Sequence, residues 1–117
     1  FAKWRCNDRE VKVPLSMMMD KVCPSPDLEY VVIIHADDRG AVVYTAEGER
    51  LHKLIPPLMK MFNYKGPKLQ ATSFASLGQK NSTMTIDVLN NNYGFIETFE
   101  LDPEKGKVGR FISHTRL

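Results

Sequence analysis

The segment 35–38, His-Ala-Asp-Asp, places an imidazole and two carboxylates together at the end of an apolar run. Alternate residues of a strand share a face, so His35 and Asp37 would point the same way. Such groups could hold a metal ion or act as an acid–base pair. The sequence identifies neither a third ligand nor a nucleophile beside them. We therefore predict no catalytic residues, no metal site and no cofactor-binding residues here.

The remaining residues that could do chemistry are scattered. His52 and His114 stand alone, the serines lack the G-x-S-x-G pattern, and the glycines form no phosphate-binding loop. We therefore expect a protein that is not an enzyme and needs no cofactor. Cys6 and Cys23 lack the CxxC spacing of a redox or zinc site, which favours free thiols in an intracellular, reducing compartment. The cytoplasm fits, and so does an organelle lumen or matrix after removal of a targeting peptide. A single disulfide between Cys6 and Cys23 is the alternative.

Aromatic residues suggest one alternative function. The string Asn-Tyr-Gly-Phe-Ile-Glu at 92–97 resembles the RNA-stacking motif of cold-shock domains, and the sequence around Phe111 loosely matches their second motif. Tyr93, Phe95 and Phe111 would then stack the bases of single-stranded RNA or DNA. The formal net charge is only +2, and the basic residues form no concentrated patch, so nucleic-acid binding is an alternative and not the main prediction.

Apolar residues give the main prediction, a surface for protein partners. Three consecutive methionines at 17–19 cannot all face one core, and methionine-rich surfaces adapt to partners. A second apolar face lies within 51–62. The residues that we expect to contact a partner are Met17, Met18, Leu54, Leu58 and Phe62.

Two helices are predicted to carry these apolar faces. Pro14 suits the first turn of a helix, and Leu15, Met18, Met19 and Val22 follow at helical spacing. Residues 47–63 show similar spacing, although Pro56-Pro57 requires either a kink or a short helix that begins at the prolines.

Strands account for the rest of one domain, 1–117, in which 1–13 form an N-terminal arm. The apolar runs 28–36 and 41–46 predict a hairpin, and period-two alternation predicts a C-terminal meander of four strands, 69–77, 82–89, 93–101 and 107–115. The predicted fold class is α+β: a mostly antiparallel five- to six-stranded sheet with two helices packed mainly on one face. No apolar run is long enough to span a membrane.

This layout resembles the roadblock family of dynein-associated light chains, within the profilin-like and longin-like group of small folds. The hairpin residues 31–34 (Val-Val-Ile-Ile) and 38–43 (Asp-Arg-Gly-Ala-Val-Val) carry the resemblance, which covers residues 14–101. It implies a non-enzymatic scaffold that forms a homodimer or joins a larger complex as an accessory subunit. Pro56-Pro57 and a C-terminal strand depart from the family pattern. Sensors of the PAS type share a comparable layout, so a small-molecule sensor is a further alternative.

Overall fold

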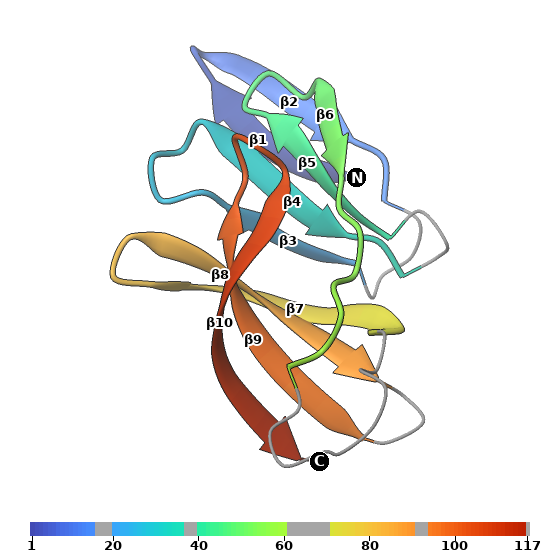
Figure 1. The fold of residues 1–117 in the computed structure, drawn as a ribbon. Coiled ribbons are helices and arrows are strands. Elements are labelled where there is room, and N and C mark those ends of the chain that lie inside the picture. Colours follow the sequence, from blue (N-terminus) through green and yellow to red (C-terminus); the bar gives the residue numbers. More distant parts are fainter. Residues whose placement is uncertain (16–19, 37–39, 61–70, 91–93, 117) are drawn as a thin grey trace.

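All regular structure in the described chain is β-strand. The computed structural model describes residues 1–15, 20–36, 40–60, 71–90 and 94–116. Within these ranges the chain forms ten antiparallel strands in three sheets, and none of the described residues is helical (Figure 1).

The central sheet has four strands in the order β3-β4-β5-β6. These strands are β3 (Lys21–Pro24), β4 (Tyr30–Ile34), β5 (Ala41–Thr45) and β6 (Arg50–Lys53). The apolar runs of β4 and β5 are buried on both faces, as expected for strands rich in β-branched residues. Ile34 pairs with Ala41, so the predicted hairpin is confirmed, and its turn at 37–39 lies outside the described residues.

An N-terminal hairpin covers one face of the central sheet. It consists of β1 (Ala2–Cys6) and β2 (Arg9–Val13), which form a separate two-stranded sheet. Ala2 and Val13 pack against the central sheet, together with partly buried Trp4. The indole Nε1 of Trp4 donates a hydrogen bond to the carbonyl oxygen of Ala46 at 2.6 Å. The predicted arm is therefore a β-hairpin that forms an outer layer.

The C-terminal sheet covers the opposite face of the central sheet. Its strands follow the order β10-β9-β8-β7 and are β7 (Ser73–Lys80), β8 (Thr83–Asn90), β9 (Phe95–Asp102) and β10 (Lys107–Arg116). In β8 the buried residues Met84, Ile86 and Val88 alternate with exposed or half-buried residues, which confirms the predicted period of two. The four-stranded meander is confirmed. The main core lies between this sheet and the central one.

Two groups of contacts join the central and C-terminal sheets. Where β3 meets β7, the ammonium group of Lys21 donates to the carbonyl oxygen of Ala75. The amide of Gln79 likewise donates to the carbonyl of Pro24 at 2.9 Å. Leu54 and Pro56 line one pocket with Lys21 and Ala75. They belong to residues 54–60, which run from β6 to the C-terminal sheet (Figure 1). We call these residues the strap.

The tip of the β9–β10 hairpin reaches β6. His52 Nε2 lies 2.8 Å from the carbonyl oxygen of Glu104, and Gly106 lies against the same imidazole. A Cβ at Gly106 would come within 2.4 Å of His52 Cγ, and this glycine has a φ of +65°. Only glycine meets both requirements without strain.

The predicted α+β fold class is wrong, and the first predicted helix is one reason. Pro14 and Leu15 are not helical, strand β3 begins at Lys21, and residues 16–19 lie outside the described chain. Pairing of β3 with β4 overrides the short apolar periodicity, since a helix of two turns gains little without packing. Among the described residues, no helix has the length and apolarity needed to cross a membrane.

The second predicted helix is also wrong. Residues 50–53 form strand β6, no residue of the strap is helical, and residues 61–63 are not described. Pro56 and Pro57 lack the N–H that a helix would use, so the chain cannot continue helical hydrogen bonding through them. The single five- to six-stranded sheet is wrong as well. The hairpin and the meander lie in different sheets, and strands cover the faces that the helices were predicted to cover.

Candidate functional site

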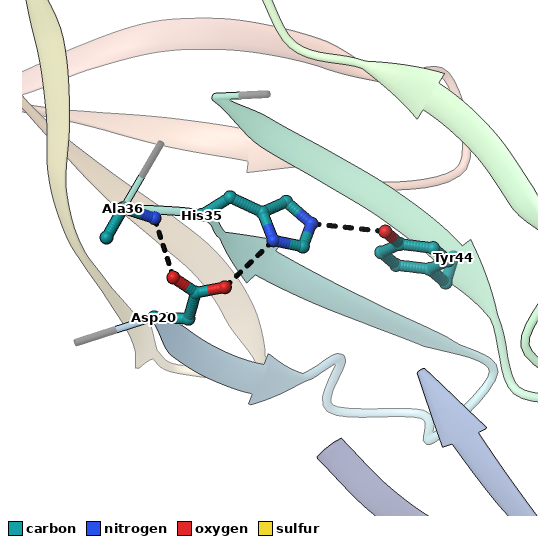
Figure 2. Close-up of polar contacts among 4 residues, drawn as sticks. All are labelled: Asp20, His35, Ala36 and Tyr44. Atoms are coloured by element: carbon teal, nitrogen blue, oxygen red, sulfur yellow. Dashed lines mark hydrogen bonds and ion pairs between the residues drawn. The ribbon is translucent and has the colours of Figure 1, made fainter. Parts of the chain in front are cut away.

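The histidine that opened the sequence analysis lies in a closed polar cluster. Figure 2 shows that Asp20, just before β3, faces the His35 imidazole, and that Tyr44 of β5 lies on its other side. His35 Nδ1 is 2.9 Å from Asp20 Oδ2, and His35 Nε2 is 3.1 Å from the Tyr44 hydroxyl. The other oxygen of Asp20 accepts the backbone N–H of Ala36 at 2.7 Å. The side chains of His35 and Asp20 are fully buried.

This geometry makes the cluster a structural element. Both ring nitrogens of His35 have partners, so neither offers a free lone pair to a metal ion or a substrate proton. Asp20 joins the segment just before β3 to the end of β4. Asp37 and Asp38 lie outside the described residues. In the described ranges, no group of three or more His, Cys, Asp or Glu side chains could hold a metal ion.

A second histidine–carboxylate pair lies at the far end of the C-terminal sheet. The side chain of Glu97 is fully buried, and its Oε2 is 3.0 Å from Nδ1 of His114. The other oxygen, Oε1, accepts the backbone N–H of Lys60 at the end of the strap. This carboxylate therefore joins the strap to β9 and β10. Unlike His35, His114 keeps 23% of its side chain exposed.

The aromatics of the nucleic-acid alternative are partly used by the core. The ring of Phe95 packs against that of His114 with centroids 5.0 Å apart, and Phe111 meets Phe99 edge-on at 5.7 Å. Phe95 and Phe111 are half-buried against the main core. Tyr93 lies outside the described residues. The core thus covers part of the Phe95 ring and part of the Phe111 ring.

An open cleft of about 770 Å³ lies between the β3–β4 turn, the β7–β8 turn and the start of β10. Its charged lining residues are Asp27, Glu100, Asp102, Lys105 and Lys107. Both signs of charge surround the cleft, so it does not favour a ligand of one charge. The buried hydroxyl of Ser25 donates to Asp27 at 2.5 Å, and this hydrogen bond, helped by the N–H of Glu29, lowers the pKa of the Asp27 carboxyl.

The predicted partner residues fall in different places. Leu54 is only 2% exposed and belongs to the main core, so its side chain cannot contact a partner on the surface. Leu58, four residues later in the strap, is 51% exposed. Met17, Met18 and Phe62 lie outside the described residues.

The residue that our prediction missed is Ile55, which is 79% exposed. It follows buried Leu54 and precedes Pro56, and its apolar side chain extends into solvent from a segment fixed at both ends. The Leu54 N–H donates to the carbonyl of Ala41 at 2.8 Å, and the strap ends at the bond between Lys60 and Glu97. The signal in the sequence was an apolar residue on each side of a proline pair.

Exposed apolar residues are concentrated in the sequence around the strap. Among the described residues, six large hydrophobic side chains are exposed: Phe1, Val22, Leu28, Leu51, Ile55 and Leu58. Three of the six lie within residues 51–58, and we call Leu51, Ile55 and Leu58 the apolar stripe. The basic residues Arg50, Lys53 and Lys60 are exposed around it, and no acidic residue occurs between 50 and 60.

Comparison with known proteins adds no family assignment. No family model, curated protein or solved structure matches this chain. The helices that the roadblock resemblance implies are also missing from the described residues, so that resemblance carries no further argument.

Proposed function

We propose that the protein is a non-enzymatic interaction module that binds a protein partner along the apolar stripe, as an accessory subunit of a larger complex. The observation that carries the proposal is the concentration of exposed apolar side chains in residues 51–58. Single apolar residues on a surface are ordinary, whereas several along one edge of a domain indicate a contact site.

The way in which the strap is held supports this proposal. Buried Leu54 and Met59 already anchor it to the core, and Glu97 fixes its end. Closure of the sandwich therefore requires nothing of the outward side chains of Ile55 and Leu58. Leaving them apolar is unfavourable in water unless another surface covers them.

The test compares the native size of the tagged full chain with that of an Ile55→Ser/Leu58→Ser variant, after gentle lysis and size fractionation. We expect the wild-type chain to elute with larger proteins and the variant to elute at the mass of one chain. Leu28→Ser is the matched control, because Leu28 is 70% exposed but lies in the β3–β4 turn. It should elute like wild type.

The substitutions at Ile55, Leu58 and Leu28 all replace exposed side chains. Each should change the free energy of unfolding by less than about 0.5 kcal/mol. Thermal unfolding of the three proteins checks this. Elution of the wild-type chain alone, or the same elution profile for the wild-type chain and the double variant, would contradict the proposal.

A further inference from the structure

A pocket of about 450 Å³ lies at one end of the sandwich, between the central and C-terminal sheets. The starts of β3 and β5 and the ends of β4 and β6 border it on the central sheet, and the start of β7 borders it on the C-terminal sheet. We call it the end pocket. Its volume falls within the range of about 300–1,000 Å³ that is typical of small-molecule sites.

Apolar side chains form the base of the end pocket. Ile34 and Leu54 line it and belong to the main core, and Phe74 lines it while packing partly buried against that core. An apolar group that enters the pocket would exchange water for contact with these side chains, which is favourable in proportion to the apolar area covered. The base therefore favours a ligand with an apolar body.

Two lysines also line the end pocket, one from each edge of the central sheet. The ammonium group of Lys21 donates to the carbonyl of Ala75, and its other two N–H donors can still meet an anion. The side chain of Lys53 reaches toward Gly40, where its Cε lies 4.0 Å from the position of an added Cβ. Both lysine side chains are exposed, and neither pairs with a carboxylate of the described chain.

The other polar groups near the end pocket leave this positive charge in place. Asp20 is fully buried, bonds to His35 and to the N–H of Ala36, and is not a lining residue. His35 lines the pocket, but both of its ring nitrogens have partners. The hydroxyl of Ser73, another lining residue, has no partner among the described residues and can donate to an anion. Residues 37–39 lie outside the described chain, so the site is built from described residues alone.

We propose that the end pocket binds a small molecule with an anionic head and an apolar tail, such as a medium-chain carboxylate. The head meets the ammonium groups of Lys21 and Lys53, and the tail lies toward the apolar base. This binding activity goes beyond the proposed function and does not depend on it, because Ile55 and Leu58 are not among the residues that line the pocket.

The experiment titrates octanoate, octanol and octylamine into the full chain and follows its backbone amide resonances by NMR. The three probes share one tail and differ in the charge of the head. We expect saturable shifts at Ala36, Gly40 and Ala75 with octanoate, and affinity at least about fivefold weaker for octanol and weaker still for octylamine. Butyrate should bind at least about tenfold more weakly than octanoate, because it buries fewer methylene groups.

A charge variant separates specific recognition of the head from general adsorption of the tail. Lys53→Gln should bind octanoate about threefold more weakly and octanol within about twofold of wild type. Lys3→Gln is the matched control, because Lys3 is exposed in β1 and does not line the pocket. It should bind octanoate as wild type does, and thermal unfolding checks that both variants are folded.

Three results would each overturn the proposal. The first is the absence of saturable octanoate shifts at the pocket amides of Ala36, Gly40 and Ala75. The second is equal affinity for octanoate and octanol, which would show that the lysines do not recognise the head. The third is an equal effect of Lys53→Gln and Lys3→Gln, which would show attraction by the overall charge of the protein and not by this site.

Discussion

The contacts that join the two sheets are of two kinds. At β3 and β7, Lys21 and Gln79 reach across with polar side chains and bond to backbone carbonyls. The strap joins the sheets with buried Leu54 and Met59 and leaves Ile55 and Leu58 exposed. β3 exposes one large apolar side chain, Val22, whereas the short strap exposes two. The proposed binding role of the strap would account for this difference.

The largest expected effect comes from removing the inward anchor of the strap. Met59→Ala deletes a fully buried side chain and should lower the free energy of unfolding by about 2–5 kcal/mol. Leu58→Ala, the adjacent outward position, should change it by less than about 0.5 kcal/mol. Urea unfolding of both variants measures the contrast. Equal effects would show that the inward and outward side chains of the strap are assigned incorrectly.

The next effect compares two polar contacts that join elements of the sandwich. Glu97→Ala removes a buried carboxylate that accepts the N–H of Lys60 and pairs with His114. It should lower the free energy of unfolding by about 2–3 kcal/mol. Gln79→Ala, on the β3/β7 side, removes an exposed hydrogen bond and should cost less than about 1 kcal/mol.

Glu97→Gln supplies the control, because its amide oxygen can still accept the N–H of Lys60. Its free energy of unfolding in urea should lie between those of wild type and Glu97→Ala. A loss of unfolding free energy for Gln79→Ala that equals or exceeds the loss for Glu97→Ala would contradict this ranking of the two contacts.

A smaller effect depends on pH and concerns the β3–β4 turn, which follows the Pro24 carbonyl bonded by Gln79. The Ser25 hydroxyl donates to Asp27 and accepts the N–H of Tyr30. Ser25→Ala should therefore lower the free energy of unfolding by about 1–2 kcal/mol at pH 7. The same hydroxyl lowers the pKa of Asp27. The folded-state pKa lies below the unfolded one, so this stabilisation is complete above the unfolded pKa of about 3.9 and is lost as pH falls through the folded value.

The difference in stability between wild type and Ser25→Ala should therefore narrow as the pH is lowered from about 6 to about 2. Thermal unfolding across this range measures it. A difference that stays constant or widens in acid would show that the hydroxyl does not stabilise the ionised Asp27.

Sequence patterns predicted the strands well where the period of two was long. Met84, Ile86 and Val88 alternate through β8, and the apolar runs of β4 and β5 mark a strand pair buried on both faces. The strap was misread because apolar residues three and four apart predict one face of an α-helix. Pro56 and Pro57 lack the N–H groups that such a helix would need, and none of residues 54–60 is helical.

The polar clusters could not be predicted because their members are distant in sequence. Asp20 lies 15 residues before His35, and Lys60 lies 37 residues before Glu97. No local pattern joins such pairs, since the packing of separate strands brings them together. Leu54 was predicted as a contact residue for a related reason. The sequence shows that Leu54 and Leu58 are apolar, but only the fold shows that Leu54 points inward and Leu58 outward.

The most direct test of the stripe as a binding surface is site-specific photo-cross-linking in the cell. A photoreactive phenylalanine derivative replaces Ile55 in one variant and Leu28 in another, and cross-linked products are compared by gel and mass spectrometry. We predict a discrete product of higher mass, containing one partner, from position 55 and none of that mass from position 28. The same products from both positions, or none from position 55, would contradict the account.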